Sequence, residues 1–378
     1  MTQGPTQIST ALEAELGRVD PDAFADDLKP GTQLLGGHYT ISGFLNSGGF
    51  GITYLAKDSL DRTVVIKECF PNALCRRSTS LVRARSRKHQ GDFRSFVDSF
   101  VAEAKSLARL VHPNIVGVHQ VFEDNDTAYM AIDFIDGRDL HDILDSTDQA
   151  FTPDQIVAML KKMLSAVEFI HQVGILHRDI SPDNILVDRT GNPILIDFGA
   201  ASEQVARATR VLTGRRVIKE GYSPQEFYLT GAEQSPASDL YSLGATFYHV
   251  ITGHPPPESQ RRLARVAEGE QDPYQPLAGR YDGYPAGFLE SIDKAVRVMP
   301  RDRIQSATDW LDWIRIAEAG GPLPAALTEP VPKVATRPVS HYVPPSGGGF
   351  LQNYAGYIVG AGVVFVLAGL AALWSVLT

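Results

Sequence analysis

Two carboxylates and an amide stand at positions where the chain could carry out chemistry. The stretch HRDISPDN (His177–Asn184) places Asp179 five positions before Asn184, and Asp197 follows in the sequence DFG at the end of an apolar run. A set of this kind could orient a hydroxyl nucleophile and hold a divalent metal ion that bridges phosphates.

A glycine-rich stretch, NSGGFGIT (Asn46–Thr53), lies between two strand-like runs. Glycines let the backbone approach phosphates closely and aim N–H groups at them, although a plain hairpin turn would explain the same residues. Lys67 ends the run VVIK, and Glu103 lies inside an amphipathic stretch further along the chain. A lysine that faces a phosphate site needs a carboxylate to hold its long side chain, so we expect these two residues to pair.

Three short runs predict the strands that would position these residues. Ile52–Ala56, Arg62–Lys67 and Thr127–Asp133 are rich in β-branched and aromatic residues and are bounded by turn residues. Between them, Phe93–Val111 has apolar residues at helical spacing, the last of them Val111, and predicts one helix.

The pattern changes to mostly helical after about residue 150. Thr152, Pro153 and Gln155 form a capping-box start for a helix, and PILID is the one short strand that follows. The expected fold class is therefore α+β, with a strand-rich lobe before a helix-rich lobe. We find no internal repeat in the sequence.

Taken in order, these motifs resemble those of the eukaryotic-type protein kinases, and more narrowly those of the bacterial, membrane-anchored serine/threonine kinases. The resemblance runs from about Gly36 to Ile316. It implies a bilobal protein-kinase fold over residues 31–318, with a β-rich N-lobe to about residue 135 and an α-helical C-lobe after it. It also implies ATP and Mg²⁺ as cofactors and protein hydroxyl groups as substrates.

The resemblance implies a role for each motif residue. Asp179 would accept or orient the substrate hydroxyl, and Lys67, paired with Glu103, would contact the nucleotide phosphates. Asn184 and Asp197 would bind the metal. The other ATP-binding positions are the phosphate-covering loop and the hinge, namely Asn46, Ser47, Gly48, Gly49, Phe50, Gly51, Thr53, Asp133 and Ile135. Structural roles are implied for Asp239, which would brace the catalytic loop, and for Glu226 with Arg303, which would form an ion pair.

Three positions depart from the family pattern. Asn46 stands at the first glycine position, Ser181 stands where a lysine is usual, and Lys219 stands where a threonine is usual. We hypothesise that Lys219 reaches into the site and replaces the absent lysine, since loss of a cation beside a transferring phosphoryl group is costly. Alternatively Lys219 points to solvent and the protein is a slow enzyme or a pseudokinase.

The segment Ala200–Ser223 corresponds to the family's activation segment. Thr209 and Thr213 lie among several arginines there and are the candidate autophosphorylation sites. The alternative is that contacts without phosphate hold the segment.

The two ends of the chain have a different character. Residues 1–30 predict a mobile leader, and 319–350 predict a proline- and glycine-rich tether. Within 351–378, the stretch Ala355–Leu377 is uncharged and long enough for the ~20 residues that cross a bilayer. Lysine and arginine occur only on its N-terminal side, which predicts a single-pass cell-membrane protein with a cytoplasmic kinase domain.

Partners follow from charge and from the apolar C-terminus. The net charge of −9 argues against nucleic acid as a partner. Gly356 and Gly360 have the spacing of helix pairs in lipid and allow a homodimer, although glycine is frequent in membrane helices in any case. The basic stretch Cys75–His89 could meet anionic lipid or be a solvated loop.

The sequence therefore predicts an ATP-dependent serine/threonine protein kinase that autophosphorylates and is tethered to a membrane. Two alternatives remain open: an ATP-binding pseudokinase that serves as a membrane scaffold, and a small-molecule phosphotransferase. Ser181 and Asn46 favour the scaffold, whereas Lys67, Asp179 and Asp197 favour catalysis.

Overall fold

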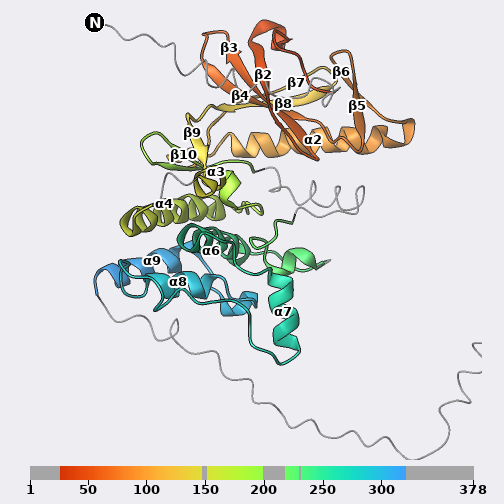
Figure 1. Cartoon of the computed structure of the whole chain (residues 1–378). Coiled ribbons are helices and arrows are strands. Elements are labelled where there is room, and N and C mark those ends of the chain that lie inside the picture. Colours follow the sequence, from red (N-terminus) through yellow and green to blue (C-terminus); the bar gives the residue numbers. More distant parts are fainter. Residues whose placement is uncertain (1–25, 147–150, 199–217, 230, 321–378) are drawn as a thin grey trace, which may run out of the picture. The chain divides into compact units, whose positions relative to one another are not determined.

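A six-stranded antiparallel sheet forms the N-terminal lobe (Figure 1). The computed structural model describes residues 26–146, 151–198, 218–229 and 231–320. The strand order is β1-β2-β3-β4-β8-β7, with β1 (Gln33–Leu34), β2 (Tyr39–Ser47), β3 (Gly51–Asp58), β4 (Thr63–Cys69), β8 (Thr127–Asp133) and β7 (Val118–Asp124).

The three strands expected from the sequence are confirmed as β3, β4 and β8. β8 lies between β4 and β7, and six of its seven residues are buried, which explains why its sequence is almost continuously apolar. β3 pairs with β4 so that Thr53 lies opposite Lys67, and β4 pairs with β8 so that Lys67 lies opposite Met130. The lysine is thus placed in the middle of the sheet.

A two-stranded hairpin, β5 (Cys75–Ser78) and β6 (Leu81–Ala84), follows β4 and is fixed to the sheet by a buried ion pair. Arg77 of the hairpin pairs with Glu68 of β4, and both side chains are almost fully buried. The hydroxyls of Tyr54 and Tyr129 donate to the same carboxylate, at 2.9 and 2.7 Å. The main-chain N–H of Arg77 donates to Asp26, which ties the start of the described chain to this hairpin.

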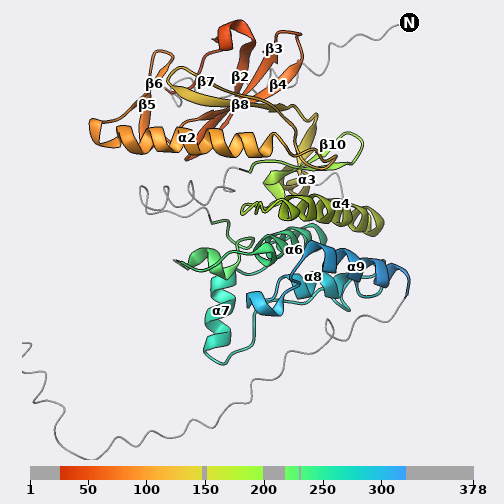
Figure 2. The same cartoon turned by 180° about the vertical axis from the view of Figure 1, so that it is seen from behind.

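Helix α2 (Gln90–Leu107) lies along the sheet and contacts β7 and β8 (Figure 2). Its buried face includes Phe93, Phe96 and Val97. The predicted C-terminal end of this helix is wrong: α2 ends at Leu107, and Val111 lies beyond it with 86% of its surface exposed. The helix stops well before Pro113, which itself only disfavours the helical conformation in the residue before it, His112.

The C-terminal lobe is built mainly from helices, with one small sheet on the side of the N-lobe. The helices are α3 (Leu140–Asp145), α4 (Pro153–Gln172), α6 (Pro236–Thr252), α7 (Ser259–Ala267), α8 (Phe288–Ala295) and α9 (Ala307–Glu318). The sheet has the order β11-β10-β9, with β9 (Gly137–Asp139), β10 (Ile185–Asp188) and β11 (Pro193–Leu195). The bilobal arrangement expected from the sequence, a strand-rich lobe before a helix-rich lobe, is confirmed. The strand expected at PILID is β11, but the expectation of a single strand after about residue 150 is wrong, because β10 pairs with it.

Helix α4 begins at the capping box that the sequence predicted. The Thr152 side chain accepts from the N–H of Gln155, and the Gln155 side chain accepts from the N–H of Thr152. The apolar face of α4 is buried against α6, α9 and β11. This helix therefore lies between the small sheet and the other helices of the C-lobe (Figure 1).

One apolar core runs from the N-lobe into the C-lobe. It includes Leu107 of α2 and Ile132 of β8 together with residues of α4, α6, α8 and α9. The main-chain N–H of Val116 donates to the carbonyl of Leu195, and the N–H of Leu195 donates to the carbonyl of Asn114. The segment after α2 thus fixes β11, two residues before Asp197.

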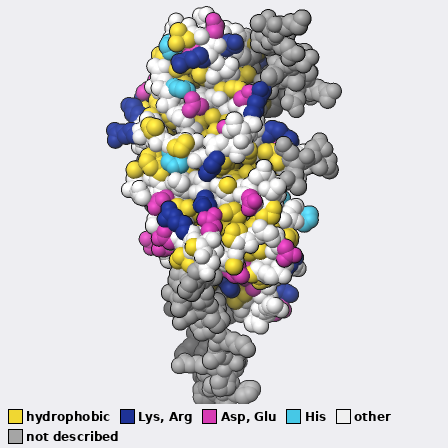
Figure 3. All heavy atoms as spheres, turned by 90° about the vertical axis from the view of Figure 1, so that its left-hand side faces the viewer, with side chains coloured by type: hydrophobic (Ala, Val, Ile, Leu, Met, Phe, Trp, Pro, Cys, Tyr) yellow, Lys and Arg dark blue, Asp and Glu magenta, His cyan; other side chains and the backbone are white. Residues whose placement is uncertain are grey.

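The surface carries charges of both signs. Figure 3 shows acidic and basic side chains interspersed on one face of the molecule. Arg76, Arg83 and Arg85 of the basic stretch are exposed on the β5–β6 hairpin and just after it.

No helix in the ranges that the structure describes is long and apolar enough to cross a membrane. The predicted membrane helix and nearly all of the tether, residues 321–378, lie outside those ranges, as do residues 1–25 of the leader. These expectations stay predictions.

We expect the Glu68–Arg77 pair to be the costliest ion pair to break in the N-lobe. Arg77→Met leaves a buried carboxylate without its cation and should lower the free energy of unfolding by about 3–5 kcal/mol. Urea unfolding followed by circular dichroism measures this loss. Arg94→Met is the matched control, since the exposed pairs of Arg94 with Asp98 and Glu123 should together be worth no more than about 1 kcal/mol. Equal effects of the two substitutions would contradict this account.

Candidate active site

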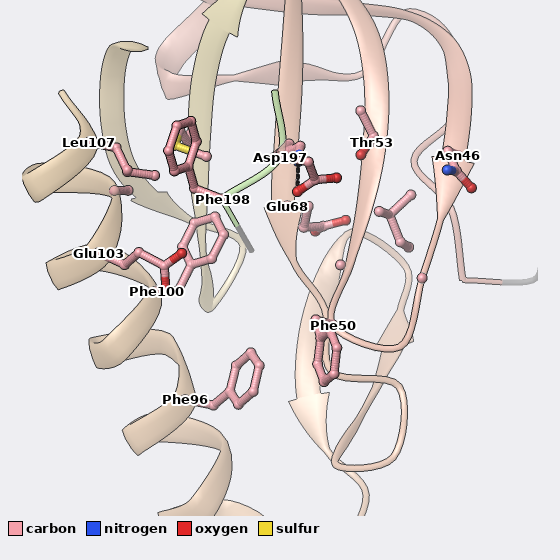
Figure 4. A pocket seen from close by; sticks show the side chains of 16 residues that line it. Asn46, Phe50, Thr53, Glu68, Phe96, Phe100, Glu103, Leu107, Asp197 and Phe198 are labelled. Carbon is pink, nitrogen blue, oxygen red and sulfur yellow. Dashed lines mark ion pairs between the residues drawn. The ribbon is translucent and has the colours of Figure 1, made fainter. Parts of the chain in front are cut away.

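A pocket opens between the β2–β3 hairpin, the sheet and α2 (Figure 4). Its lining combines a backbone-rich wall, an apolar wall and four charged side chains, those of Lys67, Glu68, Glu103 and Asp197. The lining residues that the sequence predicted as site residues are Asn46, Gly48, Phe50, Gly51, Thr53, Lys67, Glu103 and Asp197. Ser47 and Gly49 belong to the same hairpin without lining the pocket.

Gly51 is the glycine of this loop that the structure requires. A Cβ at residue 51 would lie 2.5 Å from the carbonyl oxygen of Glu68 on β4, whereas Gly48 and Gly49 have open space around them. The loop closes through a hydrogen bond from the N–H of Gly48 to the carbonyl of Gly51, at 2.9 Å. A side chain at 51 would therefore push the loop away from β4 and widen the pocket.

Lys67 forms an ion pair with Asp197 inside the pocket (Figure 4). Glu103 lines the same pocket from α2. Asp197 has a positive φ of 64°, a strained conformation for a residue other than glycine. The ion pair that holds Lys67 in the structure is thus with Asp197, and the pairing with Glu103 stays a prediction.

Asp133, at the end of β8, forms hydrogen bonds with the main chain of Gly117 and does not line the pocket. Its N–H donates to the carbonyl of Gly117, and its carboxylate accepts from the N–H of Gly117, both at 2.9 Å. His119 lies 2.9 Å from the other carboxylate oxygen. Ile135 packs against the interlobe core and is also absent from the pocket lining. These contacts fix the predicted hinge residues outside the pocket lining, and their binding of adenine stays a prediction.

Asp239, at the start of α6, organises the catalytic loop His177–Asn184. Its carboxylate accepts hydrogen bonds from the main-chain N–H groups of His177 (2.9 Å) and Arg178 (2.8 Å). His171 of α4 lies 2.8 Å from the same carboxylate. Arg178 has a φ of 65°, so the loop turns sharply there in order to present both N–H groups to one side chain. The predicted bracing role of Asp239 is confirmed.

Burial alone would raise the pKa of Asp239. The hydrogen bond and charge of His171, the charge of His177 and the N–H of Arg178 outweigh burial, so the pKa lies below its ordinary value. His177 is fully buried, and burial lowers its pKa. Its Nε2 donates to the carbonyl of Ile196, and its Nδ1 accepts from the N–H of Asp179. His177 thus links the loop His177–Asn184 to the segment that leads from β11 to Asp197.

Asp179 and Asn184 are in direct contact. The Asn184 amide donates to the main-chain carbonyl of Asp179 at 2.7 Å and to its carboxylate at 2.9 Å. Burial raises the pKa of Asp179 to about 6, with a further rise from Asp197, while Lys219 lowers it. The carboxylate is thus a stronger base than an ordinary aspartate and is still mostly ionised at pH 7.

The Lys219 side chain reaches the catalytic loop. Its ammonium nitrogen lies 2.7 Å from the Ser181 hydroxyl, 2.7 Å from the Asp183 carboxylate and 3.3 Å from the Asp179 carboxylate. Two of the three residues that depart from the family pattern, Ser181 and Lys219, are therefore neighbours in space.

The structure also shows contacts that the sequence did not reveal. Asp183 stands inside HRDISPDN, yet nothing in its spacing marks a contact with a lysine 36 positions later. His171 lies 68 positions from its partner Asp239, and Phe50 stacks on Phe96 of α2 at 6.2 Å. The predicted pair of Glu226 and Arg303 is confirmed as a buried ion pair with oxygen–nitrogen distances of 2.6 and 2.9 Å. Thr209 and Thr213 lie outside the described residues.

The donor set fits a nucleotide-bound Mg²⁺ ion better than a site made of protein alone. Within the part of the chain that the structure describes, no three His, Cys, Asp or Glu residues lie together as a metal site. Mg²⁺ commonly takes only one or two protein oxygen ligands and completes its shell with phosphates and water. Asn184 and Asp197 can supply such oxygens. The N–H of Ile196 donates to the carbonyl of Asn184, which brings the two segments together.

Comparisons with known proteins agree with this geometry. Residues 39–306 match the family model described as protein kinase domain. The serine/threonine-protein kinase PknB of Mycobacterium leprae is 30% identical over 304 residues, which cover 78% of this chain and 46% of that protein. The serine/threonine-protein kinase PrkC of Bacillus subtilis is 27% identical over 73% of this chain and 40% of its own length. The chain thus spans less than half the length of these curated relatives.

A solved structure shares both the fold and part of the sequence. The structure titled PpkA-294 apo form has a TM-score of 0.66 and is 34% identical, and the match covers 78% of this chain and all of that one. The match covers about the same share of this chain as the sequence relatives do.

The lowered pKa of Asp239 gives its contribution to stability a defined pH dependence. A carboxyl group with a depressed folded-state pKa stabilises the fold above its unfolded value of about 3.9 and loses that contribution as pH falls through the folded value. Asp239→Asn should therefore lower the free energy of unfolding by roughly 3 kcal/mol at pH 7. The difference in the free energy of unfolding between Asp239→Asn and the wild type should stay constant from pH 7 down to about pH 5 and should become smaller below about pH 4.

Melting temperatures between pH 7 and pH 3 measure this gap. Asp282→Asn, at an exposed position in the C-lobe, is the control and should melt with the wild type throughout. A gap for Asp239→Asn that does not change with pH would contradict the assignment.

Proposed function

Because the chain belongs to the protein kinase family, in its bacterial serine/threonine branch, we propose that it is an active enzyme that transfers the γ-phosphoryl group of ATP to serine or threonine hydroxyls of proteins. One observation carries this proposal. Asp179 is held by Asn184 within a loop braced by Asp239, while Lys67 and Asp197 form an ion pair in the pocket.

Asp179 has the properties of the group that receives the substrate proton. Its raised pKa makes it basic enough to accept a hydroxyl proton and leaves it mostly ionised at neutral pH. Asn184 fixes the orientation of the carboxylate through one of its two oxygens. The substrate oxygen, freed of its proton, attacks the γ-phosphorus while the bond to the β,γ-bridging oxygen breaks and ADP leaves.

The pocket residues bind the nucleotide in this proposal. The Asn46–Gly51 loop would cover the phosphates, and Lys67 would exchange its ion pair with Asp197 for contacts with the α- and β-phosphates. Asp133–Ile135 would hold the adenine through its backbone. A Mg²⁺ ion held by Asn184 and Asp197 would neutralise charge on the β- and γ-phosphates.

We extend the proposal to autophosphorylation at Thr209 or Thr213. Both threonines lie near arginines that could receive a phosphate, in the segment that leads to Lys219. Phosphate added there would lower the segment's positive charge and would pair with those arginines.

We also propose that the chain is anchored to a membrane and exposes the kinase domain to the cytoplasm. The support is the sequence of Ala355–Leu377, which is apolar over more than the ~20 residues needed to span a bilayer. Gly356 and Gly360 would let two such helices pair, so a homodimer that phosphorylates in trans is part of this proposal.

The direct test of the enzyme is phosphate transfer by the full chain with radiolabelled ATP and Mg²⁺. We expect the wild type to label itself, with phosphate mapped by tandem mass spectrometry to Thr209 or Thr213. Asp179→Asn should bind ATP normally and label at least about 10³-fold more slowly, because its base is gone. Asp282→Asn removes an exposed carboxylate and should label at the wild-type rate.

Two outcomes would count against the proposal. Equal labelling by Asp179→Asn and the wild type would show that the transfer does not depend on Asp179 as the base. ATP binding by the wild type without any transfer would favour the ATP-binding scaffold instead.

The membrane proposal is tested by alkaline carbonate extraction of membranes from cells that express the full chain. We expect the wild type to remain in the pellet. Val364→Arg/Leu367→Arg should move to the supernatant, because each arginine costs about 2.5–3.5 kcal/mol at the centre of a membrane helix. Leu60→Arg, at a position 70% exposed in the kinase domain, should pellet like the wild type. A wild type that is fully extracted would contradict membrane insertion.

A further inference from the structure

The ammonium group of Lys219 is shared among three residues of the catalytic loop, Ser181, Asp183 and Asp179. We infer that Lys219 is the catalytic cation of the phosphoryl-transfer site, that Asp183 positions it, and that Ser181 leaves the space it occupies. This inference rests on the proposed kinase function. It adds that the site is complete only when the segment that carries Lys219 is seated on the C-lobe.

The backbone of Lys219 belongs to a tight turn. The N–H groups of Tyr222 and Ser223 both donate to the Lys219 carbonyl, at 3.0 and 2.9 Å. The N–H of Lys219 donates to the Ser223 hydroxyl at 2.9 Å. The starting point of the side chain is therefore fixed by three hydrogen bonds within residues 219–223, which we call the Lys219 turn.

The Lys219 turn is seated on two helices of the C-lobe. The Tyr222 hydroxyl lies 2.6 Å from Nδ1 of His249 on α6. The Ser259 hydroxyl, at the start of α7, is fully buried and donates to the Ser223 carbonyl at 2.7 Å. Gly221 has a φ of 84°, and a Cβ there would lie 2.9 Å from the Pro255 side chain. These contacts link the position of Lys219 to α6 and α7.

The catalytic loop is shaped to receive this lysine. Ser181 is fully buried, and its small side chain places a hydroxyl 2.7 Å from the ammonium group. A lysine at position 181 would bring a second ammonium group into the same space, where two like charges repel each other. Asp183 offers a carboxylate at 2.7 Å and holds the Lys219 ammonium beside Asp179.

The charges of the site show why the cation is needed. Three carboxylates, Asp179, Asp183 and Asp197, lie around the place where a polyanionic nucleotide and a hydroxyl must meet. The ion pairs place Lys67 on Asp197 and Lys219 on Asp179 and Asp183. Without Lys219 the loop would present two uncompensated carboxylates to the incoming phosphoryl group.

The role of Lys219 in the reaction is electrostatic. The substrate oxygen forms its bond to the γ-phosphorus, the bond to the β,γ-bridging oxygen breaks with its electron pair going to ADP, and the hydroxyl proton passes to Asp179. Lys219 keeps its protons throughout. It donates hydrogen bonds to the γ-phosphoryl oxygens, where a fixed cation contributes most to the transition state.

The test measures the initial rate of phosphate transfer from radiolabelled ATP, to the full chain itself and to dephosphorylated casein, for a set of Lys219 variants. Lys219→Met should lower kcat about 10²-fold, the usual effect of losing one such donor. The Kd for a fluorescent ATP analogue should change less than threefold. Lys219→Arg, which keeps the charge, should be at least tenfold faster than Lys219→Met. Lys161→Met, on the α4 surface, is the control and should match the wild type.

Two further variants separate this role from a merely structural one. Tyr222→Phe removes the contact with His249 and should lower kcat several-fold in the wild type, with no further loss in the Lys219→Met background. Ser181→Lys/Lys219→Thr returns a lysine to the catalytic loop and should be at least tenfold faster than Lys219→Thr alone. Melting temperatures identify any variant that fails to fold. If the double variant fails to fold, the comparison of Lys219→Met with Lys219→Arg still tests whether the charge of Lys219 is needed for catalysis.

The possible outcomes distinguish this inference from the proposed function. A Lys219→Met enzyme with the wild-type kcat, or a higher one, overturns the catalytic role. A higher kcat would mean that Lys219 inhibits the enzyme by its ion pair with Asp179. A wild type that binds the ATP analogue but transfers no phosphate to itself or to casein fails the proposed function, and the inference falls with it.

Discussion

A single buried carboxylate, that of Asp239, holds the catalytic loop in shape. It accepts the N–H groups of His177 and Arg178 from one strained turn while His171 supports it from α4. An isolated buried charge would be costly, so these hydrogen bonds are what make the carboxylate tolerable at 1% exposure. Because the loop is fixed at this end, the side chains that follow, Asp179 above all, are delivered to one place.

The pocket that holds Lys67 and Asp197 depends on a different set of contacts. Lys67 is placed by its position in the middle of the sheet, between partners on β3 and β8. Asp197 is placed by β11, which is bound to the segment after α2 through main-chain hydrogen bonds. The ion pair between Lys67 and Asp197 therefore joins a residue fixed by the N-lobe to one fixed by the C-lobe. Any movement of the lobes relative to each other would act on this pair directly.

The sequence predicted those parts of the molecule that depend on local pattern or on a motif with fixed chemistry. Thr127–Asp133 and the capping box at Thr152 are local, and both were placed correctly. The end of α2 was not, because the apolar spacing continues to Val111 after the helix has stopped before Pro113. The spacing of apolar residues alone cannot show where the helix ends.

The remaining features could not be predicted because their partners are far apart in the chain and have no shared spacing. The contact of Asp183 with Lys219, the seat of Tyr222 on His249 and the support of Asp239 by His171 each join residues that only the folded C-lobe brings together. The motifs thus identified which residues could do chemistry, whereas the fold determines which of them form ion pairs and hydrogen bonds with one another.

The central claim is that the loop organised by Asp239 transfers phosphate to hydroxyl groups, and a single-turnover experiment tests it most directly. The full chain, in excess over ATP and with Mg²⁺, is quenched at successive times, and both ADP and acid-stable phosphoester are measured. We expect phosphoserine or phosphothreonine to form together with ADP in a one-to-one ratio. ATP that is fully bound yet remains intact would contradict it.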